Sequence, residues 1–148
     1  MSDLIEFLRA RLDEDEANAR AAGSAPWEAF ERDADWHIGE IDGSHVALVG
    51  RVSWPRTTAE AEHIARHDPA RVLREVEAKR RILAMHGPTV DPDGELSYPA
   101  AAKLCRTCGP GDTWEAEREP FGHLPCDHQR LLALPYSDHP DYDEAWRP

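Results

Sequence analysis

The chain has 148 residues, a mass of 16.7 kDa and a net charge of −12, from 29 acidic and 17 basic side chains. A surface this acidic repels phosphate groups, so the composition excludes nonspecific nucleic-acid binding. No stretch approaches the roughly 20 apolar residues that cross a bilayer, and the first residues lack a signal-peptide pattern. We therefore expect a cytoplasmic protein without membrane contact.

The first predicted element is an amphipathic helix. It runs from Asp3, which can cap its start, to Gly23, which can close its end. Ile5, Leu8 and Leu12 recur at helical spacing between them. These three side chains are expected to form one apolar face that packs on the rest of the protein.

A β-hairpin is predicted next, over residues 35–54. Two short runs rich in Val, Ile and Trp flank Asp42-Gly43, a dipeptide that accepts positive φ in a two-residue turn. Pro55 has no amide hydrogen to donate to a neighbouring strand, so strand pairing is expected to stop there.

Residues 57–86 predict two helices separated by a bend. Thr57 and Glu60 fit a capping box at the start of the first helix. Asp68-Pro69 restarts the helix, because Asp is a favoured N-cap and Pro is tolerated at the first helical position. The buried stripe of the second helix is expected to consist of Val72, Leu73, Val76 and Leu83.

The C-terminal third holds all three cysteines of the chain. Cys105-x2-Cys108 is followed, after fourteen residues, by His123-x2-Cys126. Each two-residue gap lets a tight turn aim both side chains at one point, and thiolate and imidazole are the ligands that zinc prefers. Three cysteines cannot all pair in disulfides. The sequence therefore predicts one structural Zn²⁺ on Cys105, Cys108, His123 and Cys126, with no position left for water.

The fourth ligand has two alternatives. His128 gives a Cys-x-His arrangement with Cys126, and His86 at the end of a predicted helix can arrive from elsewhere in the fold. His123 is preferred for its spacing. Because Cys126 opens a predicted short helix, these two dozen residues resemble a treble-clef or ribbon-type zinc finger.

A second histidine pair lies in the first of the two central helices. His63 and His67 are four residues apart and share one helical face, which is a geometry that can chelate a metal. However, Ile64 stands where the HExxH protease motif has its glutamate. We therefore expect these histidines to be surface or cap groups.

These elements together predict an α+β fold in a single domain of residues 1–148. Residues 1–88 form its helix, hairpin and bent helix pair, and residues 99–148 form the zinc-bearing segment with a short helix. The aromatic residues of the tail are expected to pin it to the body and are also candidates to anchor a partner: Tyr136, Tyr142 and Trp146.

Three phrases of the sequence are similar to a known family: "DLIEFLRARLDEDE", "EHIARHDPARVLREVEAKRRIL" and "CDHQRLLALPYSDHPDYDEAWRP". They resemble small uncharacterised proteins with a domain of unknown function, common in high-GC actinobacteria and some of their phages. The resemblance runs over most of the chain. It implies a cytoplasmic, single-domain protein without an assigned activity, and it assigns no catalytic residue.

The function indicated by these patterns is binding rather than turnover. A zinc ion with four protein ligands cannot activate water, so the zinc module is expected to stabilise a binding or regulatory protein that acts on a protein partner. The first alternative is a metal-dependent hydrolase that uses His63 and His67. The second is an acidic inhibitor that imitates nucleic acid.

Overall fold

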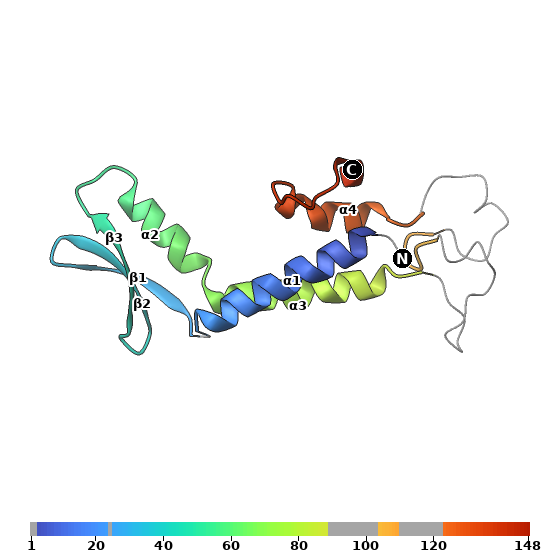
Figure 1. The fold of residues 1–148 in the computed structure, drawn as a ribbon. Coiled ribbons are helices and arrows are strands. Elements are labelled where there is room, and N and C mark those ends of the chain that lie inside the picture. The colour runs from blue at the N-terminus through green and yellow to red at the C-terminus, as the bar shows by residue number, and fades with distance from the viewer. Residues whose placement is uncertain (1–2, 24, 89–103, 110–122) are drawn as a thin grey trace. The chain divides into compact units, whose positions relative to one another are not determined.

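The chain divides into two compact units. The central unit is Glu14–Glu77, and the terminal unit combines the described residues of Met1–Asp13 and Ala78–Pro148. The single domain of residues 1–148, with a body of residues 1–88 and a zinc-bearing segment of residues 99–148, stays a prediction. The computed structural model (Figure 1) describes residues 3–23, 25–88, 104–109 and 123–148.

The order of helices and strands confirms the predicted α+β class. An N-terminal helix precedes a small antiparallel sheet, two consecutive helices and a C-terminal segment with a short helix (Figure 1). No helix in the described part of the chain is long and apolar enough to cross a membrane. The elements are α1 (Asp3–Ala21), β1 (Trp27–Arg32), β2 (Asp35–Glu40), β3 (His45–Arg51), α2 (Thr57–Arg66), α3 (Pro69–Met85), α4 (Asp127–Ala133), η3 (Leu134–Tyr136) and η4 (Glu144–Trp146).

Helix α1 ends where the sequence predicts. Gly23 follows the last turn with φ +100°, a conformation that glycine adopts without steric cost. Leu8 and Leu12 are buried as expected, whereas Ile5 is only partly buried. The buried face of the helix therefore includes Leu4, which is fully buried, in place of Ile5. The capping side chain expected at the start of α1 lies outside the described residues.

The predicted hairpin is the β2–β3 pair, and its turn contains Asp42-Gly43. Glu40 N donates to Ser44 O at 2.8 Å, and Gly43 N donates to Glu40 O at 2.9 Å. Gly43 has φ +91°, so the connection is a three-residue loop with glycine in the left-handed position. The observed loop is therefore one residue longer than the two-residue turn that the sequence predicts.

Strand β1 is absent from the sequence-based prediction. It pairs with β2 through a tight turn in which Asp33 has φ +54° and Ala34 has φ +65°. Positive φ at both central residues is typical of a type I′ turn, which usually carries Asn or Gly at these positions. Alanine rarely adopts this conformation, so the turn gave no recognisable signal.

Asp68 caps α3 as predicted. Its Oδ1 accepts a hydrogen bond from Arg71 N at 2.6 Å, and Pro69 is the first helical residue. Its Oδ2 lies 3.4 Å from Trp27 N, so the same carboxylate also contacts the start of β1. Asp68 therefore connects the bend between the helices to the sheet.

The capping box predicted for α2 was wrong. Thr57 is the first residue of the helix, and Arg56 precedes it with φ +74° and no capping side-chain hydrogen bond. Thr57 is buried, with its methyl group beside Gly50 of β3. Helix α2 packs against all three strands of the sheet, and Ile38 of β2 is fully buried. Thr57 therefore fills this interface instead of capping.

The core of the terminal unit is small and largely aromatic. Phe7 packs with Leu4, Leu8 and Ala133 in a buried cluster. The tail closes over it, with the ring of Trp146 centred 5.0 Å from that of Phe7. Other half-buried side chains that pack against the cluster are Leu83, Leu132, Tyr136 and Tyr142. The expectation that aromatic residues pin the tail is confirmed, because their rings pack against the buried cluster of the terminal unit.

Candidate metal centre

The first two cysteines lie on a tight turn of residues 105–109. Gly109 N donates to Cys105 O at 2.7 Å, which closes the turn. A Cβ atom at Gly109 would lie only 2.7 Å from Cys105 O, so any larger residue would displace the backbone. The glycine therefore lets the chain turn tightly enough to bring Cys105 and Cys108 together.

This turn is bound to the C-terminal end of α3. Arg106 N donates to Gly87 O at 2.8 Å, and the hydroxyl of Thr107 donates to Met85 O. The last carbonyl groups of a helix have no partner within the helix, so they are free to accept these bonds. The contact brings His86, the residue after α3, beside both cysteines of the turn.

The third cysteine opens α4. Cys126 is its N-cap, with Sγ accepting from the backbone N–H of Gln129. The Gln129 side chain accepts from Cys126 N at 3.0 Å and donates to His86 O at 2.7 Å. One buried amide therefore ties the start of α4 to the residue that follows α3.

The imidazole of His86 meets all three thiols. Its Nδ1 lies 3.4 Å from Cys105 Sγ, 3.3 Å from Cys108 Sγ and 3.7 Å from Cys126 Sγ. With zinc–sulfur bonds of about 2.3 Å and zinc–nitrogen bonds of about 2.0 Å, tetrahedral N and S ligands lie about 3.5 Å apart. The distances from His86 Nδ1 to the three sulfur atoms therefore match the spacing between ligands around one tetrahedral ion.

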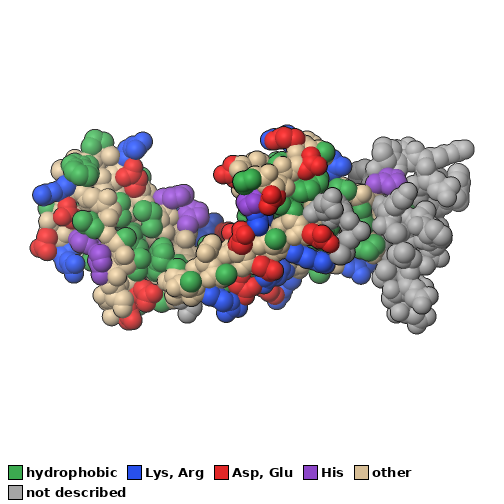
Figure 2. Space-filling view, viewed as in Figure 1, with side chains coloured by type: hydrophobic (Ala, Val, Ile, Leu, Met, Phe, Trp, Pro, Cys, Tyr) green, Lys and Arg blue, Asp and Glu red, His purple; other side chains and the backbone are tan. Residues whose placement is uncertain are grey.

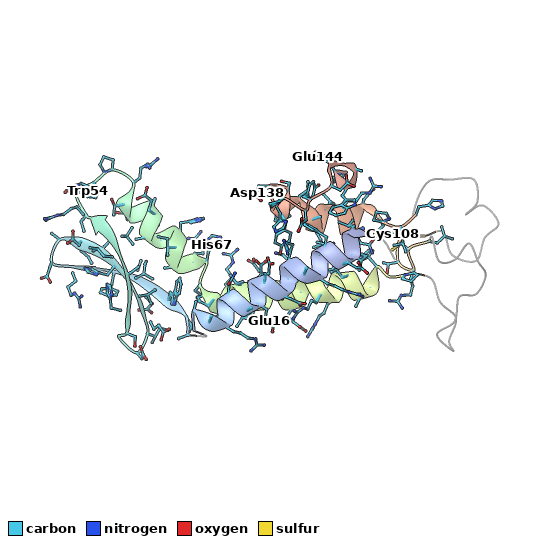
Figure 3. All side chains as sticks on the ribbon, viewed as in Figure 1. Glu16, Trp54, His67, Cys108, Asp138 and Glu144 are labelled. Carbon is cyan, nitrogen blue, oxygen red and sulfur yellow. The ribbon has the colours of Figure 1, made fainter. Side chains whose placement is uncertain are left out.

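A fifth donor stands at the exposed side of the cluster. His128 Nδ1 lies 3.3 Å from Cys108 Sγ, and its ring stacks on that of His86 at a centroid distance of 4.3 Å. Ligand atoms of His86, Cys108, Cys126 and His128 all lie within 4.8 Å of one another. Cys108 is half-buried and lies where the end of α3 approaches α4 (Figure 3).

The structure gathers the three cysteines predicted from the sequence, but not His123. That residue is exposed, forms an isolated β-bridge with Leu104, and does not belong to the Cys/His cluster. His86 and His128, the two alternatives, are both in the cluster. A Cys-x2-Cys spacing predicts a local turn. The position of His86, however, depends on the long-range packing of α3 against that turn, which sequence spacing does not predict.

Burial shifts the pKa values of three side chains in the cluster. Burial, together with the neighbouring thiols, raises the pKa of Cys108 to about 12. Burial also raises the pKa of Cys126, and it lowers the pKa of His86, with His128 adding a smaller effect. All three shifts oppose a charge on these side chains in the metal-free site. A bound divalent cation would reverse the thiol shifts, because it stabilises thiolate.

The pair of His63 and His67 offers fewer metal-binding side chains than the Cys/His cluster. The two rings lie 4.2 Å apart, both side chains are exposed, and His67 Nδ1 is 2.8 Å from His63 O. Among the described residues, no other histidine, cysteine or carboxylate joins them in a metal-binding group. Their arrangement agrees with the surface and cap roles expected from the sequence.

Comparison with known proteins identifies the family. A sequence model of DUF6221, a family of unknown function, matches residues 1–148. The chain belongs to this family. No curated protein and no solved structure matches the chain. For this DUF6221 member, the chemistry of the Cys/His cluster is therefore the main guide to function.

Proposed function

We propose that the protein holds one structural Zn²⁺ through Cys105, Cys108, Cys126 and His86. The observation that carries this proposal is the position of His86 Nδ1, at 3.3–3.7 Å from all three sulfur atoms. Three thiolates and one imidazole form a soft donor set that suits zinc and disfavours magnesium or calcium. Such a site resembles the closed sites that zinc uses for structural purposes.

The proposed ion stabilises the terminal unit. Its ligands come from three segments: the end of α3, the turn of residues 105–109 and the start of α4. The buried cluster of that unit contains Leu4, Phe7, Leu8 and Ala133, which is a modest amount of apolar burial. A zinc ion that cross-links the three segments adds binding free energy directly to folding.

A zinc ion with four protein ligands has no coordination position left for a substrate. The protein is therefore expected to act through contacts made by its surface. We extend the proposal to a binding module that acts on a protein partner. Large hydrophobic side chains reach the surface of the central unit (Figure 2). Ile41, Leu48 and Trp54 are 65%, 59% and 60% exposed, and apolar groups of this size are typical anchors at interfaces.

Elemental analysis of protein purified without added metal tests the zinc proposal. We expect one zinc per chain in the natural protein, and loss of that zinc in Cys108→Ser. A content below about a third of an equivalent would contradict a structural site, whose affinity should survive purification.

Cross-linking in a native lysate tests the binding role. The partner captured by the natural protein should be lost in a Leu48→Ser/Trp54→Ser variant of unchanged zinc content. The control is Leu131→Ser, which alters an exposed hydrophobic residue of the terminal unit and should keep the partner. Equal capture by all three proteins would contradict a role for the exposed residues.

A further inference from the structure

The cluster offers more donors than one tetrahedral zinc ion can use. Five side chains converge on it, while structural zinc takes four ligands. Four of them form the set proposed above, which includes the fully buried Cys105. The fifth, His128, is exposed and lies as close to Cys108 Sγ as His86 does, at 3.3 Å in both cases.

The donors fall into two overlapping groups of four. His86, Cys108 and Cys126 belong to both. Cys105 completes the first group from the interior, and His128 completes the second from the solvent side. Two tetrahedra that share a triangular face are related by a short movement of the ion through that face. The exposed group differs from the buried one by a single ligand.

Resting on the zinc site proposed above, we propose that His128 is a second, exchange ligand for the same ion. Zinc enters and leaves through the exposed group of His86, Cys108, Cys126 and His128. It is retained in the buried group after Cys105 replaces His128. When the ion moves outward, the lone pair of His128 Nδ1 forms the new bond, and the released Cys105 thiolate takes a proton from solvent.

The accessibility of the ligands supports this direction of entry. Cys105, Cys126 and His86 are buried, Cys108 is half-buried and His128 is exposed. A chelator can therefore approach the ion from the side of Cys108 and His128. Replacement of one ligand at a time keeps zinc four-coordinate throughout, so neither loading nor release requires a bare ion in the buried site.

Single and double substitutions test the two groups of ligands. In Cys105→Ser, His128 should complete the site, so the variant should still bind one zinc. In the cobalt-substituted form of this variant, the thiolate charge-transfer band should fall by about one third, from three thiolates to two, in a tetrahedral spectrum. His128→Ala should also bind one zinc, through Cys105. The double variant should lose the metal.

Exchange kinetics test the role of His128 without disturbing the buried ligands. Loading of zinc, and its transfer to a chromogenic chelator, should be about tenfold slower in His128→Ala than in the natural protein, at equal zinc content. The matched control is His123→Ala, which removes an exposed histidine outside the cluster and should exchange at the natural rate.

Two results would overturn the inference. One is a folded Cys105→Ser variant, judged by circular dichroism, that binds no metal. The other is His128→Ala with unchanged loading and release rates, which decides the matter even where Cys105→Ser fails to fold. A natural protein without zinc would instead contradict the proposed function itself, so the two failures are distinguishable.

Discussion

The side-chain amide of Gln129 donates to the main-chain carbonyl oxygen of His86 at 2.7 Å. The oxygen of the same amide accepts from Cys126 N at 3.0 Å, and Gln129 is only 2% exposed. Both partners are backbone groups of proposed ligand residues. A single buried side chain thus fixes two parts of the cluster relative to each other.

We expect Gln129→Ala to weaken both the fold and the metal site. It leaves two backbone polar groups without their partner, and each such loss costs about 1–3 kcal/mol when the group stays buried. Zinc affinity should fall about 10–100-fold, as is usual when a group that orients ligands is removed. Competition with a calibrated chelator measures this. Leu131→Ala, on the same helix and 53% exposed, is the control. Natural affinity in Gln129→Ala would refute the role.

Gly109→Ala should disrupt the cysteine turn. The new Cβ would lie 2.7 Å from Cys105 O, a distance that backbone atoms can avoid only by moving. The matched control is Gly87→Ala at the end of α3, where the nearest atoms to a Cβ are 3.8 Å away. Zinc content and melting temperature should fall in the first variant and hold in the second. Equal behaviour would show that the turn tolerates a side chain.

The zinc-loaded and metal-free proteins should respond to pH in opposite directions. Without metal, the raised pKa of Cys108, about 12 against an ordinary 9.0, makes the folded state hold a proton that the unfolded chain releases. Stability of the metal-free protein should therefore fall as the pH rises above about 9. With zinc, the folded state holds thiolates that the unfolded chain protonates, so stability should fall as the pH drops below about 8.

Urea unfolding at several pH values between about 7 and 10, with zinc or with a chelator, measures both slopes. Parallel slopes in the two series would mean that zinc does not bind the thiolates. The control variant is Cys108→Ser with chelator, in which the loss of stability at alkaline pH should be smaller than in the natural protein.

Local signals in the sequence predict much of this fold. Gly43 and Asp68 act on residues within one turn of themselves, so their roles follow from the amino acids alone. Strand β1 escapes prediction because its turn places Ala34 at positive φ. His86 could only be named as an alternative ligand, since α3 and the cysteine turn bring it there through long-range contacts. Sequence spacing therefore favoured His123 over His86 as the fourth ligand.

Asp68→Ala should destabilise the central unit. It removes the acceptor for Arg71 N at the start of α3, and loss of such an N-cap costs about 1 kcal/mol. It also removes the contact with Trp27 N. Denaturant unfolding should show a lower free energy of unfolding for Asp68→Ala. Asp68→Asn, which keeps a capping oxygen, should retain most of the natural stability. If Asp68→Asn is as unstable as Asp68→Ala, the charge rather than the cap is responsible.

The decisive comparison among the histidines is His86→Ala against His123→Ala. His86 Nδ1 lies within 3.7 Å of all three sulfur atoms, whereas His123 is exposed and outside the cluster. We therefore expect His86→Ala to lower zinc affinity by at least about 100-fold, because one ligand common to both proposed groups is lost. His123→Ala should bind zinc with natural affinity. Metal content and chelator competition on both variants measure the difference, and cobalt spectra report the ligand set that remains. Loss of zinc in His123→Ala, with His86→Ala unaffected, would return the fourth ligand to the residue that the sequence spacing favours.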